Sequence, residues 1–157
     1  MVELLFHSVK PPAIYKAMLV TMATGKLVLW PFAAPILDSS WLSVASGLLL
    51  FGGGALLAVA PKKLFQRTQT PMMGGPSKTS PLHTEHAFAH TRNPMYLGIS
   101  IGLAGAALLT NIRVHLIFPV VNVLIMNTFY IPKEEAELLK RFGKEYGDYR
   151  KRVRRWI

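Results

Sequence analysis

The stretch MYLGISIGLAGAALLTNIRVHLIFPVVNVLIMNTFYI, residues 95–131, decides the fold that this sequence predicts. It contains two apolar segments, 95–109 and 114–131, separated only by the four residues TNIR. A helix that crosses a membrane needs about 20 mostly apolar residues, so the second segment approaches that length and the first is short. Because the link between them is so tight, the two segments must form an antiparallel helical hairpin.

The composition of the remaining chain agrees with a membrane protein. Of the 157 residues, 51% are hydrophobic and only 17% are charged, which is too apolar for a typical soluble domain. Two further apolar segments, 13–37 and 41–60, raise the expected number of spans to about four. The N-terminal stretch lacks the basic start and cleavage site of a secretory signal, so we expect the first segment to be retained. We therefore expect one all-α domain over residues 1–157, an integral membrane bundle.

Charge predicts how this bundle is oriented. The formal net charge is +10, and the basic residues concentrate in the connection 61–93 and in the tail 132–157, whereas the two short loops on the other side contain only Arg113. By the positive-inside tendency, both termini and the connection face the cytosol. Five of the six residues 150–155 are basic. In so apolar a chain, we expect them to contact anionic membrane lipids rather than nucleic acid.

Several small or unusual residues inside the apolar segments invite interpretation. Glycines recur in the second and third segments, which favours close helix packing through small faces over a glycine-rich cofactor cradle; they are Gly47, Gly52, Gly53, Gly54, Gly98, Gly102 and Gly105. Lys26 lies within the first segment, where it either faces a cavity or partner or extends its stem toward the interface. The connection 61–93 is rich in Pro, Gly, Ser and Thr and predicts a long loop. The chain has no cysteine, which excludes disulfides, thiolate metal sites and a cysteine nucleophile.

The tail that begins at Pro132 has a different pattern. Acidic residues follow the proline closely, where they complement a helix dipole. Apolar residues then recur at steps of three and four, which predicts one face of a helix; they are Leu138, Phe142, Tyr146, Tyr149 and Val153. We therefore expect an amphipathic helix over 132–157 that lies along the cytosolic headgroup layer.

Polar residues flank the hairpin at both of its open ends. Arg92, Asn93 and Tyr96 precede or begin the segment 95–109, and Glu134 and Glu135 follow the segment 114–131. Local chemistry offers an ordinary explanation, in which the arginine extends to the interface, the asparagine caps a helix and the carboxylates complement a dipole. A hairpin, however, brings both sets to the same cytosolic face. A cation, an amide and two carboxylates would then form a pocket for a zwitterionic cofactor with an amino-acid end and a ribose.

The sequence TRNPMYLG, followed about forty residues later by EEAELLKRFGKEYGDYRKRV, resembles the isoprenylcysteine carboxyl methyltransferase and phospholipid methyltransferase group. These are integral-membrane enzymes that use S-adenosylmethionine, and the resemblance covers the chain from about Gln66 onward. It implies S-adenosylmethionine as cofactor, with contacts from Arg92, Asn93, Pro94, Tyr96, Leu97, Glu134 and Glu135. We also expect His90, which lies just before this motif, to contact the cofactor. It also implies that a basic residue of the tail, Arg152 or Arg155, lies near the methyl acceptor.

Two departures from the family pattern leave the identity of the lipophilic methyl acceptor open. Members commonly have Gly-Pro-(Tyr or Phe) where this chain has His86, Ala87 and Phe88, and the late Val-Pro-Arg is replaced by Val-Arg-Arg at 153–155. A prenylcysteine carboxylate would benefit from an arginine, either Arg92 or Arg155. A lipid amine, or a thiol, would need deprotonation, for which His90 and His86 are the nearest candidates.

Two rival interpretations come from the same residues. His83, His86 and His90 would share one face if their segment were helical, and three imidazoles can hold zinc or copper; because no carboxylate or thiolate completes the set, we expect no metal. Alternatively, the chain is a non-catalytic membrane protein whose basic tail holds anionic lipid. In that case, removing the charges of 150–155 abolishes function, whereas Glu135→Ala is silent.

Overall fold

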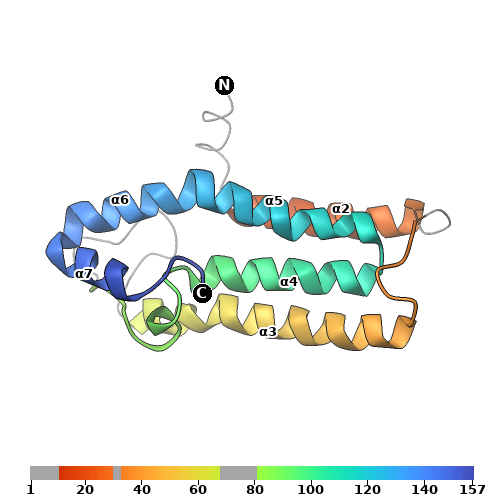
Figure 1. Ribbon diagram of the computed structural model, residues 1–157, viewed down its shortest axis with the longest axis horizontal. Helices are drawn as coiled ribbons and strands as arrows, with labels where there is room; N and C mark the ends of the chain where they lie inside the picture. Colours follow the sequence, from red (N-terminus) through yellow and green to blue (C-terminus); the bar gives the residue numbers. More distant parts are fainter. Residues whose placement is uncertain (1–10, 30–32, 68–80) are drawn as a thin grey trace, which may run out of the picture.

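The computed structural model describes residues 11–29, 33–67 and 81–157. All regular secondary structure in these ranges is helical, which confirms the all-α prediction. The elements are α2 (Pro11–Leu29), α3 (Ser40–Arg67), η1 (His86–Ala89), α4 (Pro94–Thr110), η2 (Arg113–Leu116), α5 (Ile117–Ile125), η3 (Met126–Tyr130), α6 (Ile131–Phe142) and α7 (Lys144–Arg152). Helix α4 lies in the centre of the molecule, with α3 along one side and α2 and α5 along the other (Figure 1).

The tight link after α4 forms the predicted hairpin. Asn111 adopts a left-handed conformation, with φ of 54°, that ends the helix and turns the chain toward α5. Its side-chain Oδ1 accepts hydrogen bonds from the amides of Ile36 at 2.9 Å and Leu37 at 3.0 Å. The same residue therefore closes the hairpin and fixes the segment that precedes α3. Helices α4 and α5 then run side by side in opposite directions (Figure 1).

The hairpin's second helix does not stop at the end of its apolar part. Elements η2, α5, η3 and α6 form one continuous helix, Arg113–Phe142. Pro132 lies in the first turn of α6, where a proline ring would clash with the carbonyl four residues earlier in a regular α-helix. The π-helical turn Met126–Tyr130 immediately before it adds an extra residue to the turn and lets the helix continue. The apolar part of this helix thus extends directly into its charged part.

The prediction of a single tail helix over residues 132–157 is wrong. Helix α6 ends at Phe142 because Gly143 takes a φ of 50°, a conformation that glycine adopts without steric cost. Helix α7 follows and ends at Arg152; Val153 has an extended backbone, and residues 153–157 form no regular secondary structure. The last residues consequently return to the start of α4, where the C-terminus lies (Figure 1). We call residues 153–156 the C-terminal segment.

Three other predicted boundaries also shift. The first apolar segment, expected over 13–37, contains helix Pro11–Leu29, and residues 33–39 are irregular around Pro35, while 30–32 lie outside the described residues. The second, expected over 41–60, continues as helix α3 through Pro61 to Arg67. The connection 61–93, expected to be a loop, is therefore helical at its start and carries the short helix η1 near its end. Its part 68–80 lies outside the described residues.

Helices α3 and α4 pack backbone against backbone. A Cβ atom added to Gly54 would meet backbone atoms of Gly98 and Gly102, and one added to Gly105 would meet those of Gly47 and Phe51. No side chain larger than hydrogen fits at these contacts. The predicted packing through small faces is confirmed for these positions, although Gly52 and Gly53 face open space.

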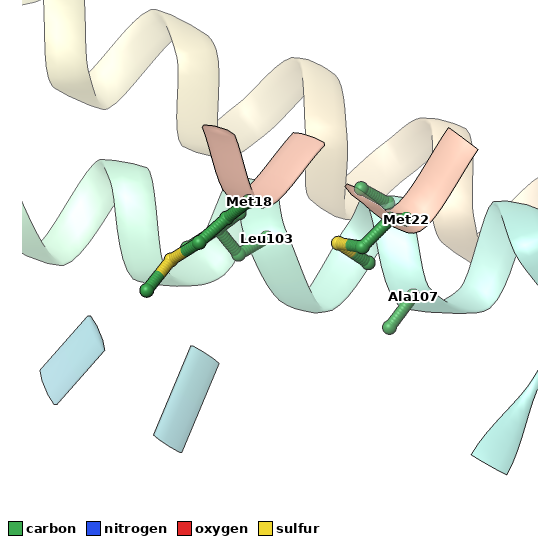
Figure 2. Close-up of a cluster of buried hydrophobic side chains, with 5 residues drawn as sticks. Met18, Met22, Leu103 and Ala107 are labelled. Carbon is green, nitrogen blue, oxygen red and sulfur yellow. The ribbon is translucent and has the colours of Figure 1, made fainter. Parts of the chain in front are cut away.

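Helix α2 packs on α4 through flexible side chains. Met18 and Met22 lie over Leu103 and Ala107 of α4 (Figure 2), and Met22 and Ala107 are almost completely buried. Unbranched methionine side chains suit the irregular space beside an alanine. Near the end of α2, Lys26 donates from Nζ to the carbonyl of Leu109 at 3.1 Å. This lysine therefore faces a partner, one of the carbonyls that the end of α4 leaves unsatisfied.

Within the described ranges, two helices are long and apolar enough to cross a membrane, Ser40–Gln66 and Arg113–Phe142, and α4 is a shorter apolar helix. Large hydrophobic side chains lie exposed along α3, including Trp41, Leu48, Leu49, Leu56 and Val59. So continuous an apolar surface is typical of lipid contact. Four spans remain a prediction.

Candidate functional site

The site begins where α4 begins. Pro94 occupies the first turn of α4, and Asn93 before it has φ of −129°. The Asn93 side chain does not cap the helix, so that expectation is wrong. Instead its Nδ2 donates to the carbonyl of Arg155 at 2.9 Å, because the C-terminal segment supplies an acceptor within reach. Thr91, which sequence reasoning missed, donates to the same carbonyl at 3.2 Å.

Arg92 connects α4 to the end of the chain. Its side chain is only 10% exposed, so it does not extend toward the interface as the ordinary interpretation expected. Nη1 donates to the carbonyls of Val153 at 2.8 Å and Arg150 at 3.0 Å, and the backbone amide donates to Arg154 at 3.0 Å. Nη2 donates to Oε1 of Glu135 at 2.7 Å. The buried Nε atom has no hydrogen-bond partner among the described residues.

Glu135 is held between two guanidinium groups. Besides Arg92, it binds Arg155, whose Nη2 lies 2.7 Å from Oε2 and whose Nε lies 3.2 Å from Oε1. Burial alone would raise the pKa of Glu135, but hydrogen bonds from Arg155 and Arg92 outweigh it and hold the pKa below its ordinary value. Arg155 also donates from Nη1 to Oδ1 of Asn127 at 2.9 Å. Glu135 is therefore a fixed negative charge.

Glu134, the next residue, has a different environment. Its Oε1 accepts a hydrogen bond from the Tyr96 hydroxyl at 2.5 Å. Burial raises the pKa of Glu134 to about 7, against the opposing effect of the Tyr96 hydrogen bond. Tyr96 belongs to a buried cluster with Met126 and Ile131, on which Tyr15, Tyr130 and Trp156 also pack. This carboxylate is thus hydrogen-bonded to a tyrosine hydroxyl, whereas Glu135 is paired with guanidinium groups.

Helix α7 is anchored to the segment before α4. Tyr146 and Tyr149, predicted on the apolar face of the tail, are both buried, and the Tyr149 hydroxyl donates to the carbonyl of Phe88 at 2.7 Å. This bond joins α7 to η1. Together with the bonds to Thr91, Arg92 and Asn93, it fixes the C-terminal segment across the start of α4.

The three histidines of the metal-site interpretation have different surroundings. His83 packs its ring beside those of Phe65 and Phe88, whereas the side chains of His86 and His90 are exposed. Within residues 11–29, 33–67 and 81–157, no group of three possible ligands is placed to hold a metal ion. His86 has φ of 55°, in the left-handed region that favours glycine. The glycine that the family resemblance expects at this position would take this conformation more readily.

The structure thus brings most of the predicted residues together. Side chains of Arg92, Asn93, Tyr96, Glu134, Glu135 and Arg155 meet at one end of the hairpin through the bonds given above. Others stay apart: Leu97 contributes its amide to helix α4, His90 is exposed, and Arg152 donates only to the carbonyl of Asp148. Tyr15 and Trp156 were missed. An aromatic residue at the edge of an apolar segment was the only available signal for Tyr15.

Fold and site together define a class: an all-helical protein with membrane-length apolar helices and a charged, largely buried site at one end of a helical hairpin. Within this class, the chain belongs to the phospholipid methyltransferase family, whose model matches residues 42–145, about two thirds of the chain. The resemblance stated from the two motifs is therefore confirmed.

A protein of Haemophilus influenzae described as uncharacterized is 42% identical over 38 residues. The aligned part makes up 24% of this chain and 60% of that protein, so the chain spans about 60% of this curated relative. No solved structure matches the chain.

Proposed function

We propose that this protein transfers a methyl group from S-adenosylmethionine to a lipophilic acceptor that reaches the site from the membrane. One observation carries the proposal. Arg92, from the first half of the motif, donates directly to Glu135, from the second half, at 2.7 Å, which supports a site where the two halves contact one small molecule. Sequence separation of about forty residues does not keep them apart, because the hairpin returns the chain to the same end.

The residues present fit the proposed cofactor. The buried, unpartnered Nε of Arg92 offers a donor for the carboxylate of an amino-acid end. Glu134 and Glu135 offer acceptors for an amino group and for ribose hydroxyls, and Asn93 and Tyr96 add polar groups that can orient them. Pro94 and Leu97 would line the pocket, with His90 at its rim. When bound, S-adenosylmethionine supplies an already activated methyl group, so the protein chiefly has to position the acceptor; positioning can contribute about 7–11 kcal/mol.

The acceptor side involves the basic residues. Arg155 or Arg92 would orient a carboxylate acceptor such as a prenylcysteine. A lipid amine must lose a proton before it attacks, and exposed His90 is available for that role. Arg92, Arg155 and His90 are therefore the proposed catalytic residues.

We further propose a single integral membrane domain with about four spans. Exposed apolar side chains on α3 and on the continuous helix support lipid contact. Both termini would lie on the cytosolic side, together with the connection 61–93 and the basic tail, in agreement with the positive-inside tendency. The cofactor site would then face the cytosol.

Binding of S-adenosylhomocysteine to the purified full chain tests the proposal. We expect the wild type to bind in a calorimetric titration and Glu135→Ala to bind at least tenfold more weakly. Because Glu135→Ala leaves Arg92 and Arg155 without their buried counter-charge, Glu135→Gln is measured beside it and melting temperatures are compared. Glu137→Ala, at an exposed position of the same helix, is the matched control.

Two outcomes would contradict the proposal. A wild type that does not bind the nucleotide removes the cofactor site. A folded Glu135→Ala variant that binds like the wild type would favour the alternative, a non-catalytic protein that holds anionic lipid through its exposed residues Arg150, Lys151, Arg152 and Arg154.

A further inference from the structure

Helix α7 and the C-terminal segment carry a second group of charges, which is exposed to solvent. Residues 148–154 contain one acid and four exposed basic residues, and these four are Arg150, Lys151, Arg152 and Arg154. We call them the basic face. The acid is Asp148, whose Oδ1 lies 3.3 Å from Nζ of Lys151. Both side chains of this pair are at least half exposed, so the pair compensates little of the positive charge.

The main chain of the same residues bonds to the site. The carbonyls of Arg150 and Val153 accept hydrogen bonds from Nη1 of Arg92. The carbonyl of Arg154 accepts one from the backbone amide of Arg92. Arg150 and Arg154 therefore contact the start of α4 through their backbone while their side chains are exposed. A partner that held these side chains from outside would also hold the backbone to which Arg92 bonds.

The basic face lacks acids to balance it. Apart from the pair of Asp148, the ion pairs in the described parts of the chain are those of Glu135 with Arg92 and Arg155. Like charges this close in sequence repel one another, and the two guanidinium groups that bind Glu135 add positive charge to the same region. An anionic surface outside the basic face would relieve this repulsion.

The position of α7 indicates which anionic surface is within reach. Figure 1 shows α7 and the C-terminus at the end of the molecule where α4 begins and α3 ends. Exposed apolar side chains of α3, such as Leu56 and Val59, approach the same end. For a chain that lies in a bilayer, we expect the headgroup layer at this level. Anionic phospholipids there present phosphate oxygens, which are strong acceptors for arginine and lysine.

We propose that the basic face binds anionic headgroups of the surrounding membrane, and that this contact strengthens cofactor binding by holding the C-terminal segment against α4. Arg154 stands where the family pattern has proline, so part of this face is particular to this chain. The link to the cofactor rests on the proposed function, whereas the lipid contact does not. Because such coupling is reciprocal, bound cofactor also strengthens the lipid contact.

Nucleotide affinity in bilayers of two compositions tests the link. The purified full chain is placed in nanodiscs of phosphatidylcholine, with or without about 30% phosphatidylglycerol, and titrated with S-adenosylhomocysteine. We expect the wild type to bind about fivefold more tightly in the anionic discs at low salt. About 0.5 M salt should remove this difference, because it screens charges at the surface.

A triple variant of the basic face shows whether its charges cause the difference. Arg150→Gln, Lys151→Gln and Arg154→Gln together remove three cations and leave the backbone carbonyls that bond to Arg92 in place. This variant should bind the nucleotide like the wild type in neutral discs, and it should lose the preference for anionic discs. If it keeps that preference, or if the wild type shows none, the link to the cofactor is overturned.

A matched control removes three exposed cations elsewhere. Lys16 lies on α2, and Lys133 and Lys140 lie on α6; all three are changed to glutamine together. The control loses as much charge as the triple variant but leaves the basic face intact. It should keep the wild-type preference for anionic discs. Loss of the preference in the control as well would assign the effect to net charge and overturn the inference.

Amide hydrogen exchange without nucleotide tests the lipid contact by itself. Exchange of residues 150–157 should slow about fivefold in anionic discs for the wild type but not for the triple variant. Unchanged exchange in the wild type overturns the lipid contact. If exchange slows while S-adenosylhomocysteine binds in neither disc, the proposed function fails and the lipid contact stands. Equal slowing by glycerol phosphate or a short oligonucleotide in neutral discs would assign the basic face to a soluble anion and overturn the inference.

Discussion

The two ends of α4 both carry polar side chains, but these bond to different kinds of partner. We call the C-terminal end of α4 the far end and its N-terminal end the near end. At the far end, Asn111 bonds to backbone groups of Ile36 and Leu37. Arg113 donates from Nε to the carbonyl of Pro35 at 2.7 Å. At the near end, Arg92 and Arg155 bind the carboxylate of Glu135. The far end satisfies main-chain groups that helix ends leave open, whereas the near end, besides bonds to main-chain carbonyls of the C-terminal part, also pairs charged side chains with one another.

This difference separates a structural role from a functional one. Bonds to backbone amides and carbonyls are required wherever helices end inside a protein. Largely buried ion pairs are not required in this way, since well-packed apolar residues often give equal or greater stability. The near end also contains the Nε of Arg92, which has no partner in the described part of the chain, and the Glu134 carboxylate, which is bonded to the Tyr96 hydroxyl. It is therefore the end that we expect to bind a ligand.

Asn111→Ala should remove hydrogen bonds at the far end of α4 without changing the site at the near end. The variant loses three side-chain hydrogen bonds to residues 36 and 37 and places alanine at a φ of 54°. We expect the free energy of unfolding to fall by about 2–3 kcal/mol, measured by thermal unfolding in detergent. Asn111→Gly should recover the backbone part of the loss. Weaker binding of S-adenosylhomocysteine by folded Asn111→Ala would contradict the division of roles.

The far end was also the more predictable from sequence. The four residues TNIR forced the hairpin, and small residues at helical spacing indicated the contact between α3 and α4. The contacts at the near end could not be predicted from local sequence patterns, because they join residues that are far apart in the chain. Arg155 reaches Glu135 only because Gly143 breaks the tail and turns α7 back, and a glycine in a helical pattern does not reveal where the chain goes next. The position of Tyr15 in the cluster was unpredictable for the same reason, because it depends on how α2 packs and not on a sequence motif.

The near end should respond to pH around neutrality. Glu134 has a pKa of about 7, and only its deprotonated form attracts a cation. Affinity for S-adenosylmethionine relative to S-adenosylhomocysteine should therefore fall about tenfold between pH 8 and pH 6, the change in the charged fraction of a group with this pKa. The two nucleotides are compared at each pH because they share their titrating amino and carboxyl groups and differ in the sulfonium charge. Glu134→Gln should show no such dependence; a wild-type profile equally flat would contradict the pKa assigned to Glu134.

The smallest expected effect concerns His86, where this chain departs from its family beside the near end. The residue holds φ of 55° with a side chain exposed to solvent, so the strain of the left-handed conformation is not offset by a buried contact. His86→Gly should raise the free energy of unfolding by about 0.5 kcal/mol, since glycine avoids the strain but loses more entropy on folding. Thermal unfolding measures this, with His90→Gly as control because His90 has φ of −107° and should lose stability instead. If His86→Gly also destabilises the protein, the imidazole must make a stabilising interaction that offsets the backbone strain. Because His86 is the first residue of η1, that interaction would lie beside the site.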